Sequence, residues 1–215
     1  SANTGRTSIA IAPSNPDIVY VMAAKSSSPA NSISNVYLSI DKGQSWRIMA
    51  PGGTNQLNIL GYYYLNNAGN PVYYYQGDYP NTLTVFPNNP YKILAGGVNM
   101  WEGQKVDETG YYQWTEKSIG DATFVFNGIF NPLYCHPNHH LYVFRTGYND
   151  QLIAASDGGI YSVTYDGSLY YFQAKNKNYN VTQFYSIGVS GEVAEAIGGT
   201  QDNGTQYISG EGNTP

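Results

Sequence analysis

The stretch that decides the fold is Ser39-Ile40-Asp41-Lys42-Gly43-Gln44-Ser45-Trp46, which has the pattern Ser-x-Asp-x-Gly-x-x-Trp. In such a turn the Asp41 carboxylate and the Ser39 hydroxyl can accept hydrogen bonds from the turn's own amides, and Gly43 can adopt a positive φ. We expect Trp46 to be a buried ring that packs between adjacent hairpins. Sugar or ion binding is the alternative interpretation of the turn, and we favour the structural one.

The strands around this turn recur along the chain. Each copy begins with a largely apolar run that ends in small or turn-forming residues, and a second run follows it. The first runs are residues 18–24, 91–97, 151–157 and 193–199, and the second runs are residues 36–39, 100–102, 160–163 and 206–209. Short hydrophobic runs bounded by turn residues are typical of buried strands. Because the small residues permit close backbone approach, we expect the first runs to be the innermost strands of successive units.

The repeat predicts an all-β fold made of β-propeller blades, which are four-stranded antiparallel sheets. The first runs begin about 42 to 73 residues apart, against roughly 40–50 residues for one blade. We interpret the excess, residues 52–80, as an insertion between strands. Residues 1–215 are then a single propeller segment of about four to five blades or part-blades. We expect an incomplete propeller or a fragment of a larger one.

The composition narrows the class of protein. Charged residues make up 12% of the chain, tyrosine occurs 22 times and the net charge is -5, so no electrostatic footprint for nucleic acid is present. No apolar stretch is long enough to span a membrane. The single cysteine excludes an intrachain disulfide framework. We expect a location outside the cell or on a bacterial cell surface, and Ser1 in place of Met indicates a mature or excised segment.

The chain resembles sortilin-like Asp-box (BNR-type) β-propellers of large bacterial secreted and surface proteins. The resemblance rests on the turn at residues 39–46, on a blade-like opening at 5–16, and on two further blocks. The first block is Cys135-His136-Pro137-Asn138-His139-His140 followed by 156–161, and the second is 183–185 followed by 198–204, which ends in Gln201-Asp202-Asn203-Gly204. The family pattern in these blocks is His-x-Asp-x-His, Asp-Gly-Gly and Gln-Asp-Asn-Gly, so Asn138 stands where the family has Asp. The resemblance implies a longer parent protein whose Asp-box turns lie on the propeller periphery.

All three histidines of the chain fall in one block and form the candidate site. On a strand, His136 and His140 would share one face with Asn138, and His139 would lie on the other. Asp157 and Asp202 hold similar turn positions in successive repeats. We therefore expect the axial rim to gather the side chains of His136, His140, Asp157, Asp202 and Asn203. The set is either a hydrogen-bonded network between blades, a binding site, or a metal site; two His and a neutral Asn make a poor zinc set, so we expect no metal and no cofactor.

No catalytic constellation is visible in the sequence. A glycosidase needs two carboxylates at a defined separation, and Glu102, Asp107, Glu108 and Glu116 are not placed across a cleft by the sequence. The three arginines, Arg6, Arg47 and Arg145, are too scattered to converge on a ligand carboxylate.

We therefore favour a non-catalytic binding or scaffolding module with a protein or glycan ligand. The alternatives are a glycoside hydrolase or sialidase-like enzyme and a structural subunit of an extracellular assembly.

The tyrosine-rich stretch at residues 61–75 has three interpretations. Its rings can stack on sugars, build a protein interface or fill ordinary half-buried strand positions. We favour an interface, because the tyrosines are too dense to be buried on alternate positions alone.

Overall fold

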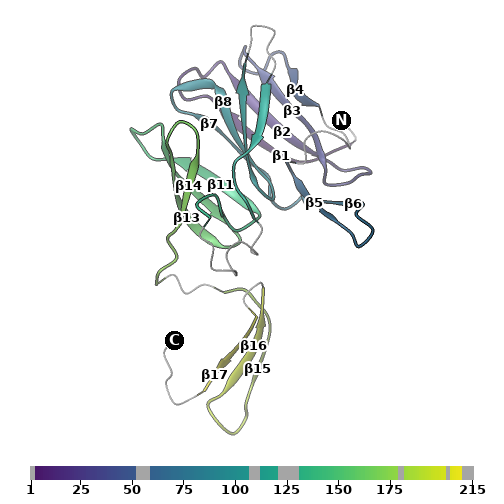
Figure 1. Cartoon of the computed structure of the whole chain (residues 1–215), viewed down its shortest axis with the longest axis vertical. Helices are drawn as coiled ribbons and strands as arrows, with labels where there is room; N and C mark the ends of the chain where they lie inside the picture. Colours follow the sequence, from purple (N-terminus) through teal and green to yellow (C-terminus); the bar gives the residue numbers. More distant parts are fainter. Residues whose placement is uncertain are drawn as a thin grey trace. The chain divides into compact units, whose positions relative to one another are not determined.

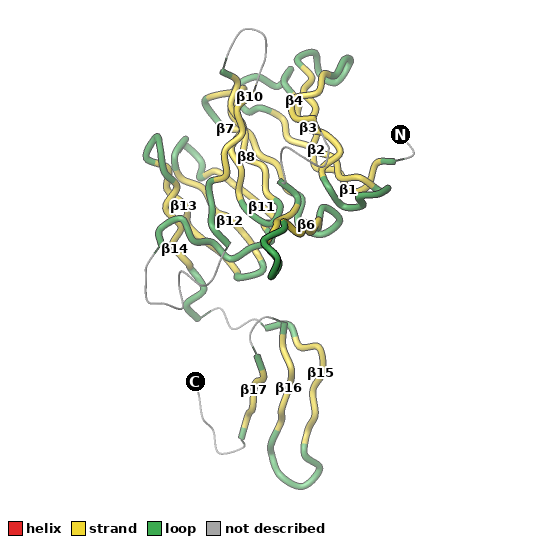
Figure 2. The backbone as a smooth tube through the Cα atoms, turned by 45° about the vertical axis from the view of Figure 1, so that its right-hand side comes forward, coloured by secondary structure: helices red, strands yellow, loops and turns green. Residues whose placement is uncertain are grey.

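The computed structural model describes residues 3–51, 59–106, 112–120, 131–178, 182–201 and 204–209. The chain divides into two compact units, Ser1–Lys175 and Asn176–Pro215, which we describe separately. All regular secondary structure in the described residues is β-strand (Figure 2). None of these residues belongs to a helix long and apolar enough to cross a membrane. Asp107, Glu108, Asp202 and Asn203 lie outside the described residues.

The first unit contains three four-stranded antiparallel sheets, which we call blades 1, 2 and 3 (Figure 1). Blade 1 comprises β1 (Thr4–Ile11), β2 (Val19–Lys25), β3 (Ile33–Ser39) and β4 (Arg47–Pro51). Blade 2 comprises β7 (Thr82–Phe86), β8 (Asn89–Gly96), β9 (Met100–Lys105) and β10 (Tyr112–Glu116). Blade 3 comprises β11 (His139–Phe144), β12 (Gln151–Ser156), β13 (Gly159–Tyr165) and β14 (Tyr170–Ala174). In each blade, strands adjacent in sequence are neighbours in the sheet, which confirms the predicted blade architecture.

Two smaller sheets complete the described strands. Strands β5 (Gly61–Leu65) and β6 (Pro71–Tyr75) form a two-stranded hairpin between blades 1 and 2 in the sequence. In the second unit, β15 (Phe184–Val189), β16 (Ala196–Thr200) and β17 (Thr205–Ile208) form a three-stranded antiparallel sheet. The hairpin falls within the stretch interpreted as an insertion and pairs with none of the blades.

The aligned runs of the sequence are equivalent strands, but they are not innermost. The first runs became β2, β8, β12 and β16, the second strand of each sheet, and the second runs became β3, β9, β13 and β17. Strand β7 lies against both β1 and β11, so the first strands are the inner ones. The small residues instead allow close approach to a loop: a Cβ on Gly97 would lie 2.0 Å from the carbonyl oxygen of Ile59.

Blade 2 is buried on both faces. Ile93 belongs to an apolar cluster shared with blade 1, whereas its neighbour Leu94 belongs to a cluster shared with blade 3. Successive residues of a strand point to opposite faces, which explains why β8 is apolar at consecutive positions.

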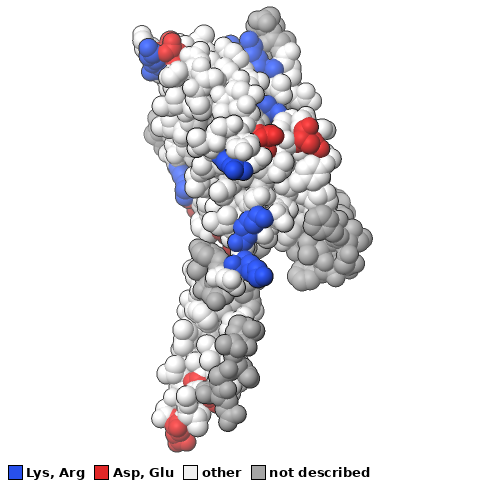
Figure 3. Space-filling model, turned by 90° about the vertical axis from the view of Figure 1, so that its left-hand side faces the viewer, with Lys and Arg blue, Asp and Glu red and all other residues white. Residues whose placement is uncertain are grey.

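The outer faces of blades 1 and 3 carry exposed aliphatic side chains. Ile9 and Ile11 of blade 1 are 66% and 58% exposed, and Leu141 and Val143 of blade 3 are exposed in the same way. Isolated exposed apolar residues are ordinary, but a row of them on one sheet face is typical of an unsatisfied packing surface. Charged side chains are scattered over the face shown in Figure 3, with uncharged surface between them.

Tyr20 links blades 1 and 2 through hydrogen bonds. Its side chain is fully buried, and its hydroxyl donates to the Pro90 carbonyl at 2.8 Å and lies 2.6 Å from the hydroxyl of Tyr112. We expect Tyr20→Phe to lower the free energy of unfolding by about 1–3 kcal/mol, because the buried Tyr112 hydroxyl and the half-buried Pro90 carbonyl each lose a partner. Urea unfolding measures the change, and Tyr62→Phe on the exposed hairpin is the matched control. Equal effects of the two substitutions would contradict the role of the Tyr20 hydroxyl.

Candidate functional site

The candidate site is centred on Asp157, in the turn between β12 and β13. The Nε2 atom of His140, near the start of the inner strand β11, lies 2.7 Å from Asp157 Oδ1 and donates to it. Asn138 Nδ2 donates to Oδ2 at 2.9 Å, and the Tyr79 hydroxyl donates to Oδ1 at 2.8 Å. The Tyr79 ring also meets the His140 imidazole edge-on, with centroids 4.9 Å apart. The predicted association of His140 with Asp157 is thus present, and Tyr79, just before β7, joins it.

His136 does not share a strand face with His140, contrary to the expectation from alternation. Strand β11 begins only at His139, because Pro137 has no amide to donate and Asn138 adopts a positive φ of 63°. His136 Nδ1 lies 3.2 Å from the Pro137 carbonyl oxygen. A Cβ on Gly158 would lie 2.2 Å from the Cβ of His136, so the imidazole stands beside the Asp157 turn without bonding its carboxylate.

His139 is fully buried and faces away from this cluster. Burial, with smaller effects from the neighbouring His140 and His136, lowers the pKa of His139 to about 3, so its imidazole is neutral at physiological pH. The described residues contain no group of three or more His, Cys, Asp or Glu side chains that could hold a metal ion. The cluster of Asp157, Asn138, His140 and Tyr79 is a set of donors around one carboxylate, which is suited to fixing a turn.

Hydrogen bonding sets the ionisation of Asp157. Burial alone would raise the pKa of Asp157, but the donors His140, Asn138 and Tyr79 outweigh it and hold the pKa below its usual range. A lowered carboxyl pKa adds stability that is fully present above the unfolded-state value near 4 and is lost as pH falls through the folded-state value.

Substitution of Asn138 tests whether its hydrogen bond to Asp157 stabilises the turn. In Asn138→Asp, a second carboxylate would replace the amide that donates to Asp157 Oδ2, and two like charges at this distance destabilise each other. We expect a loss of about 1–3 kcal/mol in the free energy of unfolding at pH 7. The folded-state pKa of the new carboxyl is raised, so its penalty should vanish as pH falls below about 4. Chemical unfolding from pH 7 to pH 3, with exposed Asn67→Asp as control, measures the difference; a penalty independent of pH would contradict the mechanism.

A second polar cluster ties blade 2 to blade 3, and the sequence analysis missed it. Glu102 of β9 is buried and pairs with Lys92 at 3.0 Å and with Lys117 at 3.7 Å. The Tyr170 hydroxyl of β14 donates to the Glu102 carboxylate. Lys92 also donates to the Tyr165 hydroxyl at 2.8 Å and lies 4.0 Å from the centre of the Tyr165 ring. Lys92 is the one charged residue in the apolar run at residues 91–97, and this isolated position in the sequence could have indicated a buried cation.

We expect removal of the buried carboxylate to be costly. Glu102→Gln leaves Lys92 desolvated without a counter-charge, a change that costs about 3–5 kcal/mol in comparable sites. The double variant Glu102→Gln/Lys92→Met should be more stable than the single variant, because the uncompensated charge is gone. Urea unfolding measures the stability of both variants, and Glu116→Gln on the neighbouring strand is the control. A double variant as unstable as the single one would show that Lys92 is not the affected group.

The turn at residues 39–46 is held by its own side chains. Ser39 Oγ accepts from the Gly43 amide at 2.7 Å, and Asp41 Oδ1 accepts from the Ser45 amide at 2.8 Å. Hydrogen bonds from Ser45 and Ser39 lower the pKa of Asp41 to about 2. Gly43 has the expected positive φ, at 86°.

Trp46 corrects the expectation of a ring buried between hairpins. It is 43% exposed, and its indole N–H donates to the Gly43 carbonyl at 3.0 Å. The indole ring lies over its own turn, because its N–H bonds to a carbonyl of the same loop.

Glu102 and Glu116 do not form an acid and base pair. Glu102 pairs with Thr115 across β9 and β10, so Glu116, one residue further, points to the other face of blade 2. Burial raises the pKa of Glu116, and a hydrogen bond from Asn99, which lowers the pKa, only partly offsets this effect. A glycosidase needs a general acid and a second carboxylate on either side of one bond, and opposite sheet faces cannot supply this.

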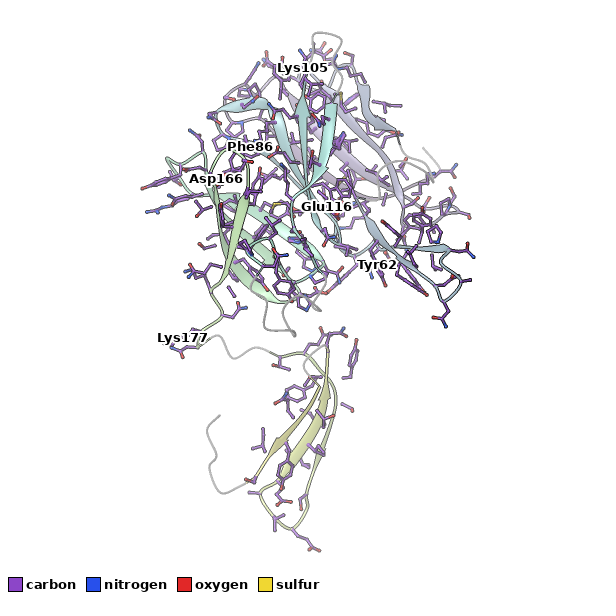
Figure 4. The ribbon with its side chains drawn as sticks, viewed as in Figure 1. Tyr62, Phe86, Lys105, Glu116, Asp166 and Lys177 are labelled. Atoms are coloured by element: carbon purple, nitrogen blue, oxygen red, sulfur yellow. The ribbon has the colours of Figure 1, made fainter. Side chains whose placement is uncertain are left out.

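An open cavity lies where the turns of blades 2 and 3 meet. Its volume is about 610 Å³, and Lys92, Asp150, Asp166, Phe86 and Asn149 are among its lining residues (Figure 4). Backbone hydrogen bonds from Leu169 and Ser168 lower the pKa of Asp166, so this side chain is an ionised turn residue and a poor proton donor at neutral pH.

Comparison with known proteins shows the fold alone. No protein-family model matches the chain, and no curated protein matches it. A solved structure of an ancestral GH74 enzyme is similar with a TM-score of 0.55 at 15% identity, over 96% of this chain. The structure of the GH74 enzyme of Niastella koreensis gives a TM-score of 0.49 at 16% identity, over 94% of this chain. The chain spans 28% of the length of each of these enzymes. Its four-stranded antiparallel sheets and its likeness to the fold of the ancestral enzyme are those of a partial propeller.

Proposed function

We propose that this chain is a non-catalytic segment of a larger β-propeller that serves binding or scaffolding in a secreted or surface-displayed bacterial protein. The observation that carries the proposal is the engagement of its carboxylates. Asp157 accepts three side-chain donors, Glu102 is paired within the interface of blades 2 and 3, and Asp41 is bonded within its own turn. Groups held in this way stabilise the blades and are not free for proton transfer.

The exposed aliphatic faces of blades 1 and 3 support the scaffold part of the proposal. In a propeller, each blade packs its faces against its two neighbours, as blade 2 does here. Further blades of a larger propeller would cover the outer faces that carry Ile9 and Leu141. The ligand of such a module is a protein or a glycan; the scattered basic residues argue against nucleic acid. The resemblance to sortilin-like propellers and the location outside the cell belong to the same proposal.

Glycoside hydrolysis is the second candidate, because one solved structure with a similar fold is an ancestral GH74 enzyme. The test is to incubate the chain with a panel of neutral and acidic polysaccharides and to measure the reducing ends released. We expect no release above a protein-free control, because Glu102 and Glu116 lie on opposite faces of blade 2 and Asp157 is held by three donors. Release that Glu116→Gln abolishes would overturn the proposal in favour of the enzyme, since burial raises the pKa of Glu116, as a general acid requires.

A further inference from the structure

The tyrosines of the β5–β6 hairpin form a surface feature that the blades do not explain. The hairpin carries Tyr62, Tyr63, Tyr64, Tyr73, Tyr74 and Tyr75, and all of these except Tyr75 are between 39% and 61% exposed. The hairpin projects from the sheets of the first unit, and Tyr62 lies on it beside further aromatic rings (Figure 1, Figure 4). Exposed aromatic surface of this density is typical of a binding site.

The rings on one face of the hairpin are nearly parallel. Tyr62 and Tyr74 are direct cross-strand partners, with ring centroids 5.3 Å apart and an interplanar angle of 14°. Tyr64, two residues along β5 and therefore on the same face, meets Tyr74 at 5.7 Å and 18°. We call these three rings the stacked-tyrosine face. The opposite face carries Tyr63, Tyr73 and the less exposed Tyr75; the rings of Tyr63 and Tyr73 are tilted by 40°, whereas Tyr73 and Tyr75 are parallel within 7° at 6.5 Å.

The hairpin is uncharged along its whole length. No Lys, Arg, Asp or Glu occurs from residue 59 to residue 77, and the tip carries Asn66, Asn67 and Asn70. The Asn66 side-chain carbonyl accepts from the amides of Ala68 and Asn70, both at 3.0 Å, so the tip has a defined shape.

This chemistry favours one class of occupant. An acidic polymer would require cations, which the hairpin lacks. A protein interface of ordinary size involves about 20–30 residues on each side, whereas this hairpin has two strands of five residues each. A neutral polysaccharide carries apolar C–H faces on its pyranose rings for stacking and hydroxyls for the phenol and amide groups around them.

We propose that the stacked-tyrosine face binds a neutral polysaccharide chain, with pyranose rings stacked against the outward faces of Tyr62 and Tyr64, the two rings that flank Tyr74. The inference rests on the proposed non-catalytic binding function and names its ligand class. Tyr74 lies between the other two rings and holds them parallel, so two sugar rings of one chain can be held at Tyr62 and Tyr64.

Affinity gel electrophoresis of the full chain tests the inference. The gels contain a soluble β-glucan, a galactomannan, or polygalacturonate as the acidic comparison. We expect at least one neutral glycan to retard the wild-type chain and polygalacturonate to leave it unretarded. The double variant Tyr62→Ala/Tyr64→Ala should bind about 10-fold or more weakly, which corresponds to the loss of two aromatic contacts.

Matched controls keep the result specific to this face. Tyr63→Ala changes the same strand on its opposite face, and Tyr148→Ala removes a tyrosine that is 39% exposed, the same fraction as Tyr62. Both controls should bind like the wild type. Unchanged urea midpoints show that the variants are folded.

The outcomes separate this inference from the proposed function. Absence of retardation by both neutral glycans, or an equal loss in Tyr63→Ala, would overturn the inference. Retardation that persists in the double variant would place binding elsewhere, overturning the inference while leaving a binding module. Self-association that the double variant abolishes, without glycan retardation, would replace the glycan with a protein partner. Release of reducing ends in the polysaccharide assay would overturn the non-catalytic function. The effect of the tyrosine substitutions on glycan binding could still be measured by gel retardation.

Discussion

The burial of blade 2 on both faces is the constraint on which the rest of the structure depends. Ile93 and Leu94 are both fully buried, yet they serve different interfaces. A sheet that is apolar on both faces is poorly registered by hydrophobicity alone, because a slip of one residue replaces one apolar side chain with another. The positions of the neighbouring blades therefore need a second source of specificity.

Polar links between blades provide that specificity. The Tyr20 hydroxyl has its partners on β8 and β10, and the Glu102 carboxylate has partners on blades 2 and 3. A shifted blade would leave each of these buried groups without a partner, at a cost of about 1–3 kcal/mol for a neutral group and more for a charge. Hydrophobic burial thus drives the association, and a few buried hydroxyls and charges select the register.

The difference between local and long-range contacts explains what the sequence could predict. The turn bonds of Ser39 and Asp41 join residues two to four positions apart, so the local pattern was sufficient to predict them. The Tyr170–Glu102 bond spans 68 residues and the Tyr79–Asp157 bond spans 78, and no local pattern encodes such pairs. The order of strands was misassigned for a related reason: apolar runs identify buried strands, but β8 is more uniformly buried than the inner strand β1. His136 was misplaced because Asn138 adopts a conformation that alternation does not anticipate.

The two kinds of exposed apolar surface in the first unit have different physical explanations. The outer face of blade 3 exposes Leu141 and Val143 while the other face of the same sheet buries Tyr142, so one further layer would complete it. The β5–β6 hairpin exposes Tyr62 on one face and Tyr63 on the other. A blade packed on one face of the hairpin would leave the rings of the second face exposed to water. A larger propeller would cover the aliphatic faces but leave the tyrosines exposed, so the exposed rings fit the proposed polysaccharide ligand better than a neighbouring blade.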